Sequence, residues 1–167
     1  MNSTTLQITP ELINKMSEHF AQSNHALFSE LAISVSRFES PEIEFTMPYN
    51  GNLVSNPQAG AYPPGVYSIL LDTVLGIGSL VAIGTPVAVA TLSLTVEYIA
   101  PNERGESLRA VGWSEAQTDN VAYATGMLYG SSSGRLLARS NGAFAINTKG
   151  PGFGEHLLGT ICSDHHQ

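Results

Sequence analysis

The sequence has few of the residues that cross-link a chain or bind it to a nucleic acid. Its 167 residues include one cysteine, Cys162. No disulfide can therefore form within the chain, and a lone thiol fits a reducing compartment. Lysine and arginine number 7 against 14 acidic residues, so the formal net charge is −7. Because affinity for a phosphate backbone comes mainly from clustered basic side chains, we expect no nucleic-acid partner.

Signals for export or membrane insertion are also missing. Residues 1–10 lack the basic region and the apolar core that a secretory signal needs. The segment 74–89 carries no charge, but Gly84, Thr85 and Pro86 interrupt it. It therefore falls short of the roughly 20 apolar residues that a membrane span requires. We expect a cytoplasmic protein that does not cross a membrane.

The length and composition predict a single domain over residues 1–167. Hydrophobic residues make up 43% of the chain and charged residues 13%, which is enough apolar material for a sizeable core. Pro10 follows Thr9 and precedes Glu11, a sequence typical of a helix start, and predicts a helix over about 10–22. We place the core at about 28–147 and a C-terminal tail at 148–167.

Alternating apolar residues predict a sheet. A hairpin is expected over 31–47, with its turn at 39–41. Four later segments alternate in the same way: VAVATLSLTVEYI (87–99), SLRAVGWSEAQT (107–118), NVAYATGMLYGS (120–131) and RLLARSNGAFAI (135–146). The connections between these four segments are short, which predicts that they run antiparallel as a meander.

The segment between the hairpin and these strands contains a long loop and an apolar helix. Residues 49–62 are rich in Asn, Gly and Pro, and a loop of this length is more often functional than accidental. The run GVYSILLDTVLGIGSLVAI is apolar nearly all round, as in a helix that protein encloses. A sheet that covers such a helix must curl around it, which is the hotdog arrangement, an α+β fold. The sheet edges left open favour dimerisation.

Three segments resemble the phenylacetic-acid-type acyl-CoA thioesterases of the hotdog superfamily: NPQAGAYPPGVYSILLDTVLG, TLSLTVEYIAP and GRLLARSNGAFAI. In that family an Asn and a Gly precede a His-Gly-Gly motif. A helix with an acid eight residues after the first motif glycine follows, and a strand ends in Tyr or Phe shortly before Pro. The similarity covers about 56–146. It implies hydrolysis of an acyl-CoA thioester, without a cofactor, by a homodimer or a dimer of dimers.

The resemblance assigns roles to individual residues. Asp72 falls on the family's catalytic acid, and Thr91 falls on the hydroxyl residue that positions water. Asn56 falls approximately on the loop amide, although Gln58 could fill this role instead.

The His-Gly-Gly motif of the family is replaced here by Pro63, Pro64 and Gly65. In the family the backbone N–H of the first motif glycine serves as a donor, and Pro64 has no N–H. The Gly65 N–H would have to take over. Pro64, Gly60 and Tyr62 are expected to line the substrate site.

Thioester hydrolysis needs a base or nucleophile on one side of the carbonyl and hydrogen-bond donors on its oxygen. Asp72 can supply the first, and the N-terminus of the central helix can supply the second. Pro64 and Asp72 are eight residues apart, which is about 12 Å along a helix and too far to serve one carbonyl. The donor and the acid are therefore expected to come from different protomers, so a dimer is required for activity.

Two other functions remain open. The missing N–H of Pro64 favours a noncatalytic hotdog protein that binds an acyl or aromatic ligand. A hydroxyacyl-thioester dehydratase is suggested by Pro-Gly-Val at residues 64–66, but such enzymes need a loop histidine, and no histidine lies between His25 and His156. Their acid is found five residues after the glycine, where this chain has Leu70. The adjacent His165 and His166 resemble a metal pair only superficially, so no metal is expected.

Overall fold

The computed structural model describes residue 15 and residues 26–39, 41–84 and 87–149. Apart from residue 15, the helix expected over 10–22 lies outside these residues, as does all of the tail after residue 149. The elements in chain order are α2 (Ala26–Leu31), β1 (Ser34–Glu39), β2 (Glu42–Met47), the 3₁₀ turn η1 (Gly51–Leu53), α3 (Pro64–Ile83), β3 (Val89–Tyr98), β4 (Leu108–Gln117), β5 (Val121–Gly130) and β6 (Leu136–Ile146).

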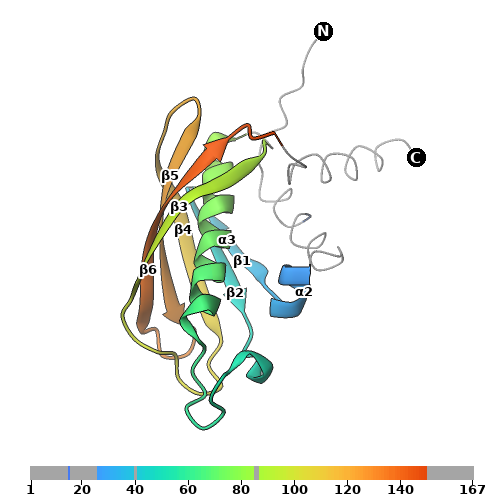
Figure 1. Cartoon of the computed structure of the whole chain (residues 1–167), viewed down its shortest axis with the longest axis vertical. Helices are drawn as coiled ribbons and strands as arrows, with labels where there is room; N and C mark the ends of the chain where they lie inside the picture. The colour runs from blue at the N-terminus through green and yellow to red at the C-terminus, as the bar shows by residue number, and fades with distance from the viewer. Residues whose placement is uncertain (1–14, 16–25, 40, 85–86, 150–167) are drawn as a thin grey trace, which may run out of the picture.

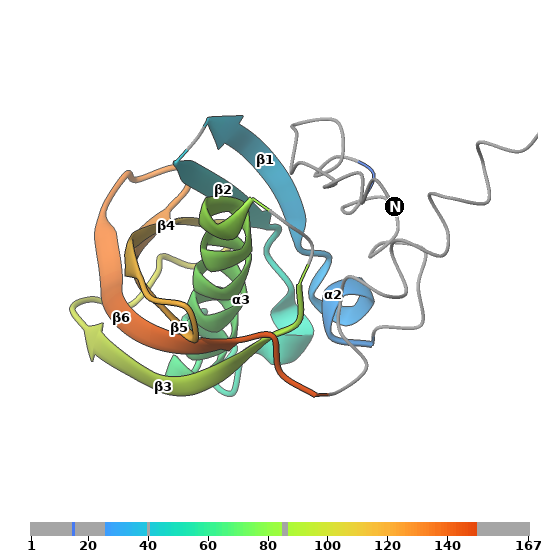
Figure 2. The ribbon, with the colours of Figure 1, turned by 90° about the horizontal axis from the view of Figure 1, so that it is seen from above.

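The strands form one six-stranded sheet in the order β1-β2-β4-β5-β6-β3, with every neighbouring pair antiparallel. The sheet curls around α3, and the view along the helix shows α3 enclosed on the concave side (Figures 1 and 2). The α+β hotdog fold expected from the sequence is confirmed.

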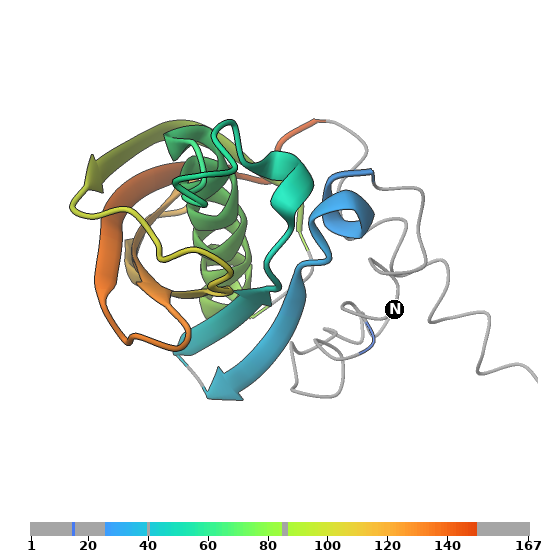
Figure 3. The ribbon, with the colours of Figure 1, turned by 90° about the horizontal axis from the view of Figure 1, so that it is seen from below.

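Two details of the sheet differ from the expectation. The hairpin is present, with Glu39 opposite Glu42, but its first strand begins at Ser34 because Leu31 ends α2 and Ala32 adopts a φ of 50°. The prediction that the last four strands form one meander is wrong for β3, which pairs with β6 and not with β4. The segment 99–107 is too long for a tight turn and crosses beneath the start of α3 (Figure 3).

Helix α3 is bounded by residues that suit its two ends. Pro64 occupies the first helical position, where its missing N–H breaks no helical hydrogen bond. Gly84 ends the helix at a φ of 74°, and its N–H donates to the carbonyls of Leu80 and Val81. By length and mean hydropathy (2.0) α3 could cross a membrane, but 56% of that window is buried inside the protein, as in the core helix of a soluble protein.

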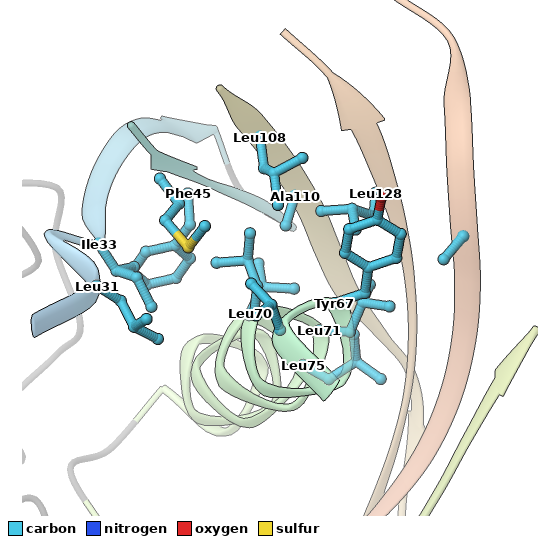
Figure 4. Packing of buried hydrophobic residues seen from close by; sticks show 14 of the residues in the cluster. Leu31, Ile33, Phe45, Tyr67, Leu70, Leu71, Leu75, Leu108, Ala110 and Leu128 are labelled. Atoms are coloured by element: carbon cyan, nitrogen blue, oxygen red, sulfur yellow. The ribbon is translucent and has the colours of Figure 1, made fainter. Parts of the chain in front are cut away.

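The core lies between α3 and the strands that it faces. Leu70, Leu71 and Leu75 are fully buried and point toward the side chains of the sheet (Figure 4). Two strand glycines let the helix approach the sheet. A Cβ at Gly112 would lie 3.0 Å from the carbonyl oxygen of Val74, and one at Gly126 would lie 2.3 Å from Cδ1 of Leu75.

A buried carboxylate anchors the connection between β3 and β4. Glu106 is 3% exposed and accepts hydrogen bonds from its own connection at Glu103 N (2.9 Å) and from the β5–β6 turn at Ser133 N (2.9 Å) and Ser132 Oγ (3.0 Å). Burial raises the pKa of Glu106, but these hydrogen bonds outweigh it and lower the pKa to about 2. Gly130 permits this arrangement, since a Cβ there would lie 2.2 Å from the carboxylate.

The depressed pKa of Glu106 predicts how stability depends on pH. The contribution is complete above the unfolded value of 4.5 and is lost as the pH falls through the folded value of about 2. The difference corresponds to about 3 kcal/mol. Urea unfolding should therefore show Glu106→Gln to be less stable than wild type at pH 6, with a difference that shrinks between pH 4.5 and pH 2. Glu115→Gln, the same change at an exposed strand residue, is the control. A stability difference for Glu106→Gln that is unchanged by pH would contradict this assignment.

Candidate active site

The structure brings Asp72 and Thr91 together. Asp72 lies on α3 and is half-buried, and Thr91 lies on β3, the edge strand beside that helix. The Thr91 hydroxyl donates to Asp72 Oδ1 at 2.8 Å. Among the described residues no other hydrogen bond reaches the Asp72 carboxylate, so Oδ2 is available to a water or a substrate.

A second hydroxyl pair lies one helical turn away. Ser68 and Tyr98 share a hydrogen bond of 2.6 Å between their hydroxyl oxygens. Ser68 precedes Asp72 by four residues, so both side chains lie on the same face of α3. Tyr98 is 50% exposed at the end of β3. Neither residue was predicted from the sequence, although the four-residue spacing of Ser68 from Asp72 was a usable signal.

The start of α3 presents a backbone donor. Pro63 precedes the helix without a side-chain cap, Pro64 has no N–H, and Val66 N donates to the Pro63 carbonyl at 3.0 Å. The N–H of Gly65 has no acceptor among the described residues. Gly65 is exposed, and no heavy atom lies within 4 Å of the place that a Cβ would take. Such an end of a helix, with a free N–H and the positive end of the helix dipole, suits a negatively charged oxygen.

The loop before α3 is held in shape by its own residues. Asn56 Oδ1 accepts hydrogen bonds from the backbone N–H groups of Gln58 (3.0 Å) and Ala59 (3.4 Å), and the Asn56 carbonyl accepts from Gly60 N (3.0 Å). Gln58 is exposed. Gly60 adopts a φ of 69° against Arg104, whose Cγ would lie 2.3 Å from an added Cβ. The position therefore requires glycine.

Tyr62 is buried, and its polar groups already have partners within the chain. Its hydroxyl accepts from Asn50 N at 2.6 Å, and its backbone N–H donates to Asn102 Oδ1 at 2.8 Å. The ring packs against Tyr49 with 5.5 Å between the centroids. Burial raises the pKa of the Tyr62 phenol, so the group stays neutral. Through these contacts Tyr62 stabilises the loop before α3.

The acid and the free donor lie at different heights of the helix. Seven residues separate Gly65 from Asp72, which is about 10 Å along the axis. A carbonyl group cannot bridge this distance, so the two groups of one chain do not form one reaction centre. Among the residues that the structure describes, no group of three or more His, Cys, Asp or Glu side chains could hold a metal ion.

A surface depression lies elsewhere on the described part of the chain. It has a volume of about 300 Å³ and is lined by residues that include Ser93, Tyr123, Thr125 and Asn141. Tyr123 and Thr125 alternate along β5 with Ala122 and Ala124, which are buried toward the helix. The depression is therefore on the outer face of the sheet, away from Asp72, and is not the candidate site.

Comparisons with known proteins establish the fold. No protein-family model matches the sequence, and no curated protein matches it. Solved structures do match. A thioesterase from Haemophilus influenzae superimposes with a TM-score of 0.69 at 19% identity, covering 84% of this chain and 94% of that one. A thioesterase family protein from Silicibacter pomeroyi gives 0.69 at 21% identity, with 81% and 97% covered.

A third similar structure is the E. coli PaaI protein from the phenylacetic acid degradation operon. Its TM-score is 0.66 at 16% identity, and the match covers 81% of this chain and 95% of that one. The chain therefore has the hotdog fold of thioesterase-superfamily proteins over nearly their whole length. At these identities the likeness establishes the fold alone.

Proposed function

We propose that this protein hydrolyses an acyl-CoA or related thioester to a carboxylic acid and a thiol, at a site that two protomers share. The observation that carries the proposal is the pairing of Asp72 with Thr91 on the exposed side of an otherwise buried helix. A half-buried carboxylate among apolar helical positions costs free energy unless it has a partner or a function. The names of the similar structures, which are thioesterases, support the same reaction.

Asp72 is the group that activates water in the proposed reaction. Its carboxylate accepts a proton as the water oxygen adds to the thioester carbonyl carbon. The Thr91 hydroxyl orients the carboxylate through the 2.8 Å hydrogen bond and positions the water with its oxygen lone pairs. The tetrahedral intermediate then collapses to the carboxylic acid as the carbon–sulfur bond breaks, and the leaving thiolate takes up the proton that Asp72 accepted, which gives the free thiol and restores the carboxylate.

Gly65 supplies the donor for the developing oxyanion. Its N–H has no acceptor within the described chain and points from the positive end of α3. A donor of this kind acts on charge that exists mainly in the transition state, so it raises kcat. We propose that Asn56 or Gln58 contributes a side-chain amide beside it. Pro64 would line the substrate at the same end of the helix.

A second copy of the chain brings the donor and the acid together. Among the described strands β3 pairs on one side only, with β6, and the strand and its end expose Leu92 (60%), Tyr98 (50%) and Ile99 (52%). Such an edge favours association with another chain. A two-fold axis beside the helices would place the start of one α3 next to Asp72 of the other. We propose a homodimer, or a dimer of dimers, in the cytoplasm.

Replacing Asp72 tests the proposed base. Asp72→Asn keeps the side-chain volume but removes the charge and the basicity. We expect it to lower kcat for acyl-CoA hydrolysis by at least about a hundredfold while the unfolding transition stays in place. Release of free thiol from a panel of acyl-CoA thioesters measures the rate. Asp119→Asn, the same change at an exposed turn, is the matched control and should retain full activity. Wild-type turnover in Asp72→Asn would refute the assignment.

A noncatalytic protein that binds an acyl or aromatic ligand is the second candidate. Pro64 favours it, because the helix start has one backbone donor fewer than a glycine would give. A third function, dehydration of a hydroxyacyl thioester, needs a histidine base. No histidine occurs between residues 25 and 156.

The substitution Pro64→Gly separates these candidates. If Gly65 already supplies the oxyanion donor, the variant should keep kcat within about threefold of wild type. It should also lose about 0.5–1 kcal/mol of stability, because glycine raises the conformational entropy of the unfolded chain. An increase of tenfold or more would show instead that the missing N–H limits catalysis, since one donor contributes about 2.7–4 kcal/mol. Inactivity of both proteins, with acyl-CoA still bound, would favour the binding protein.

A further inference from the structure

We infer that Asn102, in the connection between β3 and β4, is the positioning residue that sets the place of the Gly65 donor at the start of α3. The inference rests on the proposed function and assigns to Asn102 no contact with reacting atoms. Asn102 is 3% exposed, and it lies 30 residues after Asp72 in the sequence. Its role follows from the groups that its side chain joins.

Asn102 holds the chain on both sides of Gly65. Its Oδ1 accepts from Tyr62 N at 2.8 Å and from the Tyr67 hydroxyl at 2.8 Å. The backbone N–H of Asn102 donates to that same hydroxyl at 2.7 Å. Tyr62 precedes Gly65 by three residues and Tyr67 follows it by two. The Asn102 side chain therefore fixes the chain at Tyr62 and at Tyr67, and the Gly65 N–H lies between these two positions.

The amide nitrogen extends the same support to the loop. Nδ2 donates to the Gly60 carbonyl at 3.4 Å and to the Glu103 carbonyl at 2.8 Å. With two acceptor bonds and two donor bonds the side chain uses its full hydrogen-bonding capacity. Aspartate could accept both hydrogen bonds on one oxygen but would face two carbonyls with the other. Leucine or alanine would leave several buried polar groups without partners.

The connection that carries Asn102 is itself held in place. The buried Glu106 carboxylate ties it to the β5–β6 turn, and the Arg135 guanidinium donates to the Pro101 carbonyl. Arg104 packs against Gly60 from the same connection. Seen from the end where α3 begins, this connection and the loop before the helix run side by side (Figure 3). Asn102 thus joins the helix start to a connection that is itself hydrogen-bonded to the β5–β6 turn.

Loss of Asn102 should act on the transition state and not on substrate affinity. A donor displaced by a fraction of a bond length stabilises the developing oxyanion less, which lowers kcat, while ground-state binding elsewhere is unchanged. The Asp72–Thr91 hydrogen bond joins α3 to β3 at a separate point and remains in place. The expected signature is therefore a split between kcat and KM that general loss of stability does not produce.

The test compares Asn102→Ala, Asn102→Asp and Tyr67→Phe with Phe38→Ala. The control residue Phe38 packs against the core from β1, at the sheet edge opposite to β3. Its replacement by alanine should lower stability without changing the helix start. Thiol release is measured well below each melting temperature. We expect kcat to fall at least tenfold in the Asn102 variants, and less in Tyr67→Phe, with KM within about threefold of wild type. Phe38→Ala should keep both constants.

Amide hydrogen exchange tests the inference independently of the measured activity. Amide hydrogen exchange of Val66, whose N–H donates to the Pro63 carbonyl, reports the order of the helix start. It should quicken at least tenfold in Asn102→Ala and not in Phe38→Ala. If wild type hydrolyses no thioester, the proposed function fails, and the exchange still shows whether Asn102 positions this segment. If wild type is active and the Asn102 variants keep its kcat and its exchange, the inference is overturned. Should they not fold, Tyr67→Phe gives the same two readouts.

Discussion

The burial of one apolar helix governs the rest of this structure. Helix α3 is apolar nearly all round, so water must be excluded from most of its surface, and the sheet achieves this by curling around it. Gly112 and Gly126 allow the backbones to approach closely enough. The sheet leaves uncovered one strip of the helix surface beside the edge strand β3, and Ser68 and Asp72 lie on this strip. The polar groups of the candidate site lie where the sheet stops.

The helix supplies two chemical groups at two heights. Its middle carries the Asp72 carboxylate, oriented by Thr91, and its start presents the N–H of Gly65. The axial distance of about 10 Å between them explains why the proposed reaction needs a second copy of the chain. Asn102 holds the chain on both sides of the helix start, and the buried Glu106 holds the connection that carries Asn102 to the β5–β6 turn. In the proposed reaction this connection therefore serves both stability and the placement of the donor.

A run that is apolar nearly all round predicted the central helix, and the alternation of apolar residues predicted the six strands, because burial of one face of a strand produces such alternation. It did not predict the partner of β3, since the length of the segment 99–107 is compatible with a hairpin or a crossing. The candidate pair Asp72 and Thr91 came from the family resemblance, as nothing local distinguishes Thr91 from an ordinary strand residue. The role of Asn102 could not be predicted from the sequence, because its partners Tyr67 and Gly60 are 35 and 42 residues away.

Subunit complementation tests the central claim, a site shared by two protomers, most directly. Asp72→Asn removes the acid, and Gly65→Leu blocks the helix start with a side chain that the protomer itself has space for. Each variant alone should be inactive in thiol release. After unfolding and refolding together in equal amounts, mixed dimers contain one intact site, so about a quarter of wild-type activity should return. If each protomer holds a complete site, mixing will restore nothing, and the shared site is disproved.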